Sequence, residues 1–170
     1  TKPLGTGIVM AAAALGQASA AAVGYCYDQM NKSNYDAMKV FLSENVSALT
    51  DVTGYGLVGH LSEILKASNC GVTLTLDSVP SFPDSESLMA GGYCSSLQES
   101  NELVLMDFEL GKGLTLLMPK VRMLVDPQTA GGLLAAIPKE NAEGCLSRLR
   151  ELGYQSEIIG TIEEKEWSIQ

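Results

Sequence analysis

The sequence predicts an α+β domain in which a mixed β-sheet packs against helices. Short apolar segments typical of strands alternate irregularly with amphipathic segments typical of helices, without the regular order of a parallel βαβ sheet. The chain has 170 residues, of which 46% are hydrophobic and 18% charged. This length and composition suit one domain with one core, spanning residues 1–170, rather than two large domains.

The first part of the chain predicts one strand and two helices. Residues 8–10, followed by the alanines at 11–14, predict a buried strand after a loop at residues 5–7, and the alanine-rich stretch 17–30 predicts a helix. A capping box at residues 33–36, with Asp36 in place of Glu, predicts the start of the next helix. The apolar face expected for that helix consists of Tyr35, Met38, Phe41 and Leu42.

The middle of the chain carries the clearest periodic signals. Residues 46–52 predict a strand that ends at Gly54, and a helix is expected to begin near Gly56. The helix is indicated by apolar residues at i, i+4, i+7 and i+8, namely Leu57, Leu61, Ile64 and Leu65. Residues 72–76 alternate between apolar and polar, as a half-buried strand does. The stretch 77–87, rich in Pro, Ser and Asp, predicts a surface loop.

The last part of the chain predicts further strands and helices. A helix is expected at residues 95–101 and a strand at 114–118, followed by a core strand at 133–137. Apolar positions between residues 142 and 149 indicate a helix, with Gly153 placed to end it. A final strand is expected at residues 156–162.

Composition excludes several classes of function. The net charge of −9 argues against nucleic acid and anionic membrane surfaces as partners. No apolar run approaches the about 20 residues that span a bilayer. The four cysteines lie far apart without metal-site spacing, which predicts reduced, packed thiols in a cytoplasmic protein. An acidic chain that binds a phosphate group needs a metal ion or a basic partner.

The strongest local motif is T-D-V-T-G-Y-G-L-V-G-H at residues 50–60. A strand brings Asp51 to its carboxyl end, a glycine-rich turn follows, and a helix begins at once. Exposed backbone N–H groups at such a turn attract anions, and a carboxylate beside them suits Mg²⁺, which binds carboxylates, waters and phosphate oxygens together. The alternative is that Asp51 only caps the helix or the turn.

Two further glycine-rich segments are less specific by themselves. In D-P-Q-T-A-G-G-L-L, at residues 126–134, the two glycines permit a close approach to a ligand or to another loop, but on its own the pattern favours an ordinary junction between a loop and a strand. The opening T-K-P-L-G-T-G is similar to a phosphate cradle without the spacing of a P-loop. Lys2 is the only basic residue close in sequence to any of these turns.

In this order and at this separation, the three segments resemble the second half of selenophosphate synthetases. The resemblance covers residues 1 to about 162 and implies the fold of the carboxy-terminal domain of aminoimidazole ribonucleotide synthetase-like proteins. It implies a reaction of ATP, selenide and water that gives selenophosphate, AMP and phosphate, with Mg²⁺. The full-length protein is expected to be a homodimer, and this chain its carboxy-terminal half.

The resemblance also implies how the residues divide their roles. Asp51 matches the one metal-ligating aspartate of this half, while the other metal ligands and the catalytic Cys or selenocysteine belong to the amino-terminal ATP-binding domain. No catalytic residue is expected in this half, which alone is expected to be inactive. The residues expected to contact ATP are Lys2, Gly5, Thr6, Gly7, Thr53, Gly54, Gly56, Thr129, Gly131 and Gly132.

Other readings stay open at this point. His60 could lie behind Asp51, although a packed helical histidine is the commoner case. Cys94 has no recognisable base near it, and a basic cluster of Lys112, Lys120 and Arg122 could face phosphates or only solvent. Residues 91–101 depart from the family pattern. Another ATP-dependent synthetase or kinase of the same superfamily, or a non-catalytic binding module, is the alternative function.

Overall fold

Helices and strands follow one another in an irregular order, and the computed structural model describes all residues from 1 to 170. The α-helices are α1 (Thr6–Ala14), α2 (Ala20–Asn31), α3 (Tyr35–Ser43), α4 (Gly56–Ser68), α5 (Ser85–Ala90), α6 (Gln98–Glu102), α7 (Pro119–Arg122) and α8 (Lys139–Glu151). The short 3₁₀ helices are η1 (Leu76–Ser78), η2 (Leu103–Asp107) and η3 (Met123–Val125). The strands are β1 (Ala48–Asp51), β2 (Gly71–Leu74), β3 (Glu109–Leu110), β4 (Leu133–Ala136), β5 (Gly160–Glu163) and β6 (Trp167–Ile169).

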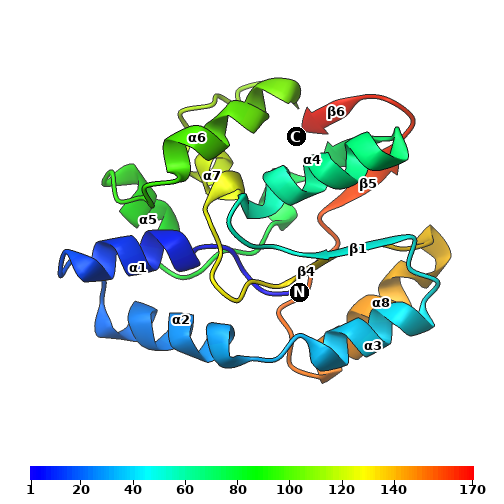
Figure 1. Cartoon of the computed structure of the whole chain (residues 1–170), viewed down its shortest axis with the longest axis horizontal. Helices are drawn as coiled ribbons and strands as arrows, with labels where there is room; N and C mark the ends of the chain where they lie inside the picture. Colours follow the sequence, from blue (N-terminus) through cyan, green and yellow to red (C-terminus); the bar gives the residue numbers. More distant parts are fainter.

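The strands form two sheets. β1 and β4 pair antiparallel as a two-stranded ribbon, which sets Asp51 opposite Leu133. The other sheet has the order β3-β6-β2-β5, in which β5 is antiparallel and β6 parallel to β2. Mixed strand directions packed with helices confirm the predicted α+β class. Figure 1 shows the ribbon passing between α4 on one side and the pair α3 and α8 on the other.

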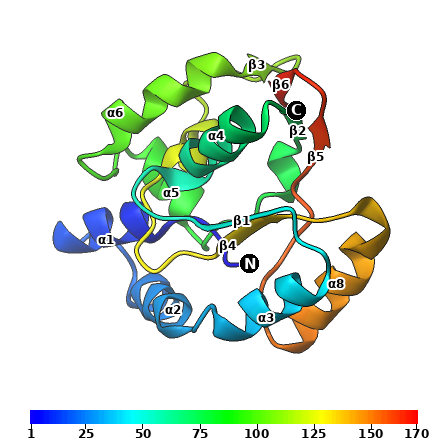
Figure 2. The same ribbon diagram turned by 45° about the vertical axis from the view of Figure 1, so that its right-hand side comes forward.

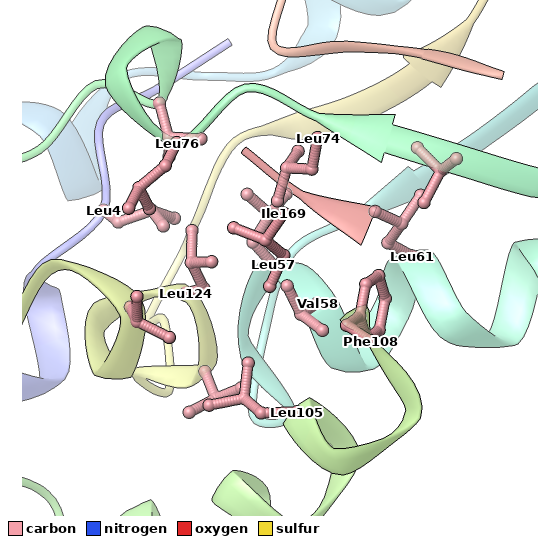
Figure 3. Packing of buried hydrophobic residues seen from close by; sticks show 14 of the residues in the cluster. Leu4, Leu57, Val58, Leu61, Leu74, Leu76, Leu105, Phe108, Leu124 and Ile169 are labelled. Atoms are coloured by element: carbon pink, nitrogen blue, oxygen red, sulfur yellow. The ribbon is translucent and has the colours of Figure 1, made fainter. Parts of the chain in front are cut away.

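Helix α4 lies at the centre of the main core. Leu57, Leu61 and Leu65 are each 5% exposed or less, as their spacing on one helix face predicts. They pack against side chains from β2, β6, η2 and η3 (Figure 3). The buried members of this core are Leu4, Val52, Leu57, Val58, Leu61, Leu65, Val72, Leu74, Leu76, Val79, Leu105, Phe108, Val121, Leu124, Val125 and Ile169. This core fixes the start of α4, where the candidate site lies.

A second, smaller core lies between α3, α8 and the β1–β4 ribbon (Figure 2). Its buried residues are Ala37, Val40, Phe41, Cys145, Leu149 and Tyr154. Helix α8 ends as predicted, because Gly153 follows the last turn with a φ of 77°, in the left-handed region that glycine favours. Tyr154 then turns inward, and its hydroxyl donates to the Ser33 carbonyl at 2.6 Å.

Residues 8–10 belong to helix α1, so the predicted strand is wrong. Ile8 and Val9 are both 0% exposed, and a short segment that is apolar on every side shows no period that separates helix from strand. The alanines that follow are strong helix formers. Gly5, with a φ of 133°, stands before the helix, and Thr6 and Gly7 already lie in its first turn.

Helix α3 begins where predicted, and Ser33 of the predicted capping box accepts a hydrogen bond from the Tyr35 N–H at 3.1 Å, whereas the reciprocal carboxylate bond of the box does not form. The Asn34 side chain makes no cap hydrogen bond and donates instead to the Gly131 carbonyl at 2.8 Å. The predicted buried face was also wrong in part, since Tyr35 is 57% and Leu42 62% exposed. The residues of α3 that are buried are Ala37, Val40 and Phe41.

Two strand predictions near the end of the chain need correction. Residues 114–118 form irregular backbone with one turn, and the nearest strand is β3, upstream of them. The strand predicted at residues 156–162 begins only at Gly160, and β6 follows it without having been foreseen. Both corrections concern strands of the four-stranded sheet, whose pairing joins segments far apart in sequence.

The thiols have the environment that composition predicted. Cys26 and Cys145 are buried and all four cysteines are free. Burial, with a smaller contribution from the nearby Asp126 carboxylate, raises the pKa of the Cys26 thiol to about 11. Such a thiol is unreactive at neutral pH. None of the helices has both the length and the apolar character needed to span a bilayer.

We expect Leu124→Ala to lower the free energy of unfolding by about 3 kcal/mol, because it leaves a cavity in the main core. Leu124 is 1% exposed, whereas Leu117, the matched control, is 85% exposed. Leu117→Ala should stay within about 0.5 kcal/mol of the unchanged protein. Urea denaturation followed by circular dichroism measures both. Equal effects would contradict this position of the core.

Candidate functional site

The three glycine-rich segments singled out in the sequence meet in space. The loop after β1 and the loop before β4 lie side by side, because the Val52 N–H donates to the Gly132 carbonyl at 2.8 Å and the Gln128 N–H to the Thr53 carbonyl at 2.9 Å. The amino-terminal segment joins them, since the first N–H of β4 donates to the Thr1 hydroxyl at 2.6 Å. Figure 1 shows this end of the chain beside β4.

Most glycines of these segments allow one backbone to approach another. A Cβ atom on Gly131 would lie 2.1 Å from the Val52 carbonyl oxygen, and one on Gly132 would lie 2.5 Å from the Lys2 nitrogen. Gly56 has a φ of 69°, and a Cβ there would lie 2.5 Å from the Val125 carbonyl carbon. Packing inside the chain is therefore sufficient to require glycine at these three positions.

Gly54 differs from the other glycines of the turn. A Cβ atom there would meet nothing within 4 Å, so no contact inside the chain requires glycine. The Asn101 side chain donates to the Gly54 carbonyl at 2.8 Å and to the Val125 carbonyl at 3.0 Å. Asn101, which is buried, thus holds the turn from the protein interior while leaving the Cα face of Gly54 open. This gives residues 91–101 a structural role that their sequence did not reveal.

Thr6 and Thr129 bind each other at the start of α1. The Thr129 N–H donates to the Thr6 hydroxyl oxygen at 2.8 Å. Gln128, which is 5% exposed, accepts through Oε1 from the Gly5 N–H at 3.2 Å and the Thr6 N–H at 3.3 Å. The free N–H groups at this helix end are therefore satisfied by a residue far away in sequence.

Asp126 is a buried carboxyl group at the same helix end. It is 0% exposed, and its Oδ2 accepts from the Gly7 N–H at 3.1 Å and the Gln128 side chain at 2.8 Å. Burial raises its pKa from 3.8 to about 7, although the hydrogen bonds from Ile8, Gln128 and Gly7 act in the opposite direction. A Cβ on Gly7 would lie 2.5 Å from Oδ1 of Asp126, so this contact requires Gly7 to be glycine.

Asp51, the predicted metal ligand, lies at the end of β1 with its side chain exposed. Its carboxylate makes no hydrogen bond and no ion pair within the chain. The Thr50 hydroxyl donates to the backbone carbonyl of Asp51, at 3.2 Å, and not to the carboxylate. Tyr55 precedes the first residue of α4, and no side chain caps that helix. The alternative that Asp51 is a cap is therefore wrong. An exposed carboxylate without a partner is free to bind a cation.

Thr53, two residues further on, contacts His60 of α4. Thr53 Oγ1 lies 3.0 Å from His60 Nε2, and His60 Nδ1 lies 3.2 Å from Glu63 Oε2. The sequence left open whether His60 lies behind Asp51 or is only packed in the helix. In the structure, His60 contacts Thr53 rather than Asp51, and its side chain is 11% exposed. Glu63 was missed, although its i, i+3 spacing from the only histidine could have indicated it.

Lys2 points into the chain rather than outward. It is 7% exposed, and its Nζ donates to the Ala130 carbonyl at 2.8 Å. Burial lowers its pKa from the usual lysine value. Two of the three residues of the basic cluster are paired within the chain, since Lys120 contacts Asp77 at 2.6 Å and Arg122 contacts Glu102 at 2.6 Å. Contact of Lys2 with a phosphate stays a prediction.

A cavity of about 590 Å³ is lined in part by these loops, through Lys2, Val52 and Gly132, and does not reach Asp51. Its walls come mainly from apolar residues of β2, β4, α4 and α8. Asp51, Gly54 and His60 do not line it. The cavity is therefore mainly apolar and, apart from Val52, does not include the residues of the T-D-V-T-G-Y-G turn singled out above, so the exposed turn after β1 is the better candidate site.

The exposed turn fits a divalent cation only as part of a shared site. The structure contains no group of three or more His, Cys, Asp or Glu side chains that could hold a metal ion. Asp51 offers a carboxylate, and Thr53, two residues further on, offers a hydroxyl oxygen. Oxygen donors with open coordination positions match what Mg²⁺ prefers, because this ion keeps several waters and takes phosphate oxygens.

The chain matches one known protein family along almost its whole length. A family model described as "AIR synthase related protein, C-terminal domain" matches residues 1–168. The chain belongs to this family. The expected resemblance to aminoimidazole ribonucleotide synthetase-like domains is therefore confirmed.

Curated relatives narrow the resemblance within the AIR synthase related family. The chain is 37% identical over 170 residues to the selenide, water dikinase of Myxococcus xanthus and 34% identical over 171 residues to that of Pelobacter propionicus. These matches cover 96% and 97% of this chain but 47% of each relative. The chain therefore spans about half the length of the curated relatives it matches.

Solved structures confirm the family fold. Escherichia coli HypE matches with a TM-score of 0.66 at 17% identity, over 99% of this chain and 44% of HypE. A HypE solved in complex with ATP matches with a TM-score of 0.66 at 20% identity, over 95% of this chain and 40% of that protein. Thiamine monophosphate kinase of Aquifex aeolicus matches with a TM-score of 0.58 at 14% identity, over 100% of this chain and 48% of the kinase.

We expect Asp126 to make stability depend on pH. Its pKa of about 7 in the folded chain lies above the ordinary value of 3.8, so folding takes up a proton between these values. The free energy of unfolding should therefore fall as pH rises from about 4 to about 7, by roughly 2–4 kcal/mol from this group. Asp126→Asn should remove that slope in urea denaturation, and the exposed control Asp28→Asn should keep it. An unchanged slope in Asp126→Asn would contradict the assignment.

Proposed function

We propose that this chain is the carboxy-terminal domain of a selenide, water dikinase, which makes selenophosphate, AMP and phosphate from selenide, ATP and water. The proposal depends on one observation above the others, the exposed and unpartnered carboxylate of Asp51 at the end of β1. It is supported by the identity of 34–37% to proteins of that name, along nearly the whole of this chain.

Asp51 would act as one ligand of Mg²⁺ at a site shared with an amino-terminal ATP-binding domain. The ion, when bound, supplies positive charge against the phosphates of ATP. This chain contributes the Asp51 carboxylate, the open face of Gly54 and the backbone turn that leads into α4. Thr53 lies at the same turn, where it can receive a water or cation on the side opposite His60.

The other residues predicted to contact ATP mostly contact other parts of this chain. Gly7, Gly56, Gly131 and Gly132 hold the segments together, and Thr6 and Thr129 bind each other. Their part in nucleotide binding would therefore be to shape the wall of the site. The reacting groups would belong to the amino-terminal domain, with no catalytic residue in this half, and the full-length protein would act as a homodimer in the cytoplasm.

We expect Asp51→Asn in the full-length protein to lower selenide-dependent AMP formation at least about 100-fold, because a neutral amide is a poor ligand for Mg²⁺. The fold should be unchanged, since the carboxylate makes no contact that a melting curve would report. Asp28→Asn on α2 removes the same charge at an exposed position and is the control. Turnover of Asp51→Asn near that of the control would remove Asp51 from the metal site.

Gly54→Ala tests whether a ligand approaches the open face of the turn. Because the added Cβ meets no atom of the chain within 4 Å, we expect thermal stability to change little. We expect the KM for ATP to rise about tenfold, as the methyl group occupies space that the nucleotide needs. Gly24→Ala on α2, where the Cβ also meets nothing, is the matched control. An unchanged KM would show that no ligand comes close to Gly54.

A further inference from the structure

A hydrogen-bonded series of three side chains ends at the exposed turn after β1. It runs from Glu63 through His60 to Thr53, with heavy-atom distances of 3.2 Å and 3.0 Å. The His60 side chain is 11% exposed, whereas that of Glu63 is 63% exposed. The series therefore connects a solvent-exposed carboxylate to the hydroxyl of a residue two positions from Asp51.

Helix α4 and the turn before it fix this geometry. His60 and Glu63 lie three residues apart, on the same face of the helix. The Tyr55 ring covers His60 with its centroid 5.7 Å from that of the imidazole. A Cβ on Gly59 would lie 2.6 Å from the Tyr55 Cβ, so glycine at this position leaves room for the tyrosine. This contact with Tyr55 explains why residue 59 is a glycine, since a Cβ there would meet no other residue.

The proton positions follow from the chemistry of the three groups. An ionised Glu63 can only accept a hydrogen bond, so His60 must donate from Nδ1. In a neutral imidazole, Nε2 is then unprotonated and can only accept. The Thr53 hydroxyl must therefore donate its proton to Nε2. Its oxygen lone pairs are left for whatever approaches the turn from outside.

We propose that Glu63 and His60 hold the Thr53 hydroxyl as an oxygen acceptor, which together with Asp51 receives a hydrated divalent cation. This inference rests on the proposed function for the identity of the cation. Val52 is 3% exposed, while Asp51 is exposed and Thr53 half-buried, so Asp51 and Thr53 are the two side chains of this stretch that solvent reaches. His60 and Glu63 are positioning residues that act through Thr53.

The opposite proton arrangement has a different consequence. If Nε2 carried the proton, the Thr53 hydroxyl would accept from His60 and donate outward, which suits a phosphate oxygen rather than a cation. The tautomer of His60 therefore decides whether the Thr53 hydroxyl offers lone pairs to a cation or a proton to an anion. The tautomer can be measured without any ligand and without enzymatic activity.

The test is nitrogen NMR of the 170-residue chain labelled in its imidazole nitrogens. His60 is the only histidine of the sequence, so every imidazole signal belongs to it. At mildly alkaline pH we expect the proton on Nδ1, and in Glu63→Ala a shift of the population toward Nε2. Thr73→Val in β2, whose hydroxyl accepts from Ser168 at 3.3 Å, should leave the spectrum unchanged. A proton on Nε2 in the unchanged chain would overturn the proposal.

The second arm uses the full-length protein and varies Mg²⁺ at saturating ATP. Thr53→Val and Glu63→Ala should each raise the Mg²⁺ concentration for half-maximal turnover about tenfold, with little change in kcat. Thr53→Ser, which keeps the hydroxyl, should restore the original value. A Mg²⁺ requirement unchanged in Thr53→Val would overturn the cation role. Absence of selenide-dependent turnover would instead overturn the proposed function, and the spectrum would still decide the proton arrangement.

Discussion

The structure around the candidate site depends on close backbone contact between the loop before β4 and the turn after β1. Gly131 touches the Val52 carbonyl so closely that any side chain would collide with it, and the Val52 N–H bonds back to Gly132. The same loop satisfies the start of α1 through Gln128. The loop before β4 thus aligns the β1–β4 ribbon and orients α1, and β1 ends with Asp51 at the surface.

The elements that the sequence predicted well are those with a strong local period. The apolar stripe of α4 and the alternation in β2 follow directly from local residue order, as does the glycine that ends α8. Helix α1 could not be predicted in this way because Ile8 and Val9 are buried on different faces. The separate β1–β4 ribbon was also not foreseen, because its pairing joins residues more than 80 positions apart.

At the site, the sequence identified the three segments that meet, but it did not show which contact each residue makes. A glycine required by a ligand and one required by another backbone are indistinguishable in sequence, and only the structure separates Gly54 from Gly131. Gln128 and Asn101 were missed because their partners are distant in sequence. Glu63 could have been predicted, since a carboxylate three residues after a helical histidine is a local sequence pattern.

The charge distribution explains why a cation must accompany any phosphate at this turn. The chain carries a net charge of −9, and several of its basic side chains are already paired with carboxylates. These pairs are Lys66–Asp107, Lys120–Asp77, Arg122–Glu102, Arg148–Glu44 and Arg150–Glu157. Surface pairs of this kind add little stability, but they leave less free positive charge for an anion. Lys2, the one lysine within the three segments, donates to a carbonyl instead. The negative charges of the chain would therefore repel a polyphosphate that approaches Asp51 without a metal ion. A polyphosphate that carries Mg²⁺ would instead be attracted, because the Asp51 carboxylate can bind the ion. The acidity of the domain, unfavourable for binding a bare nucleotide, thus favours the metal-bound form.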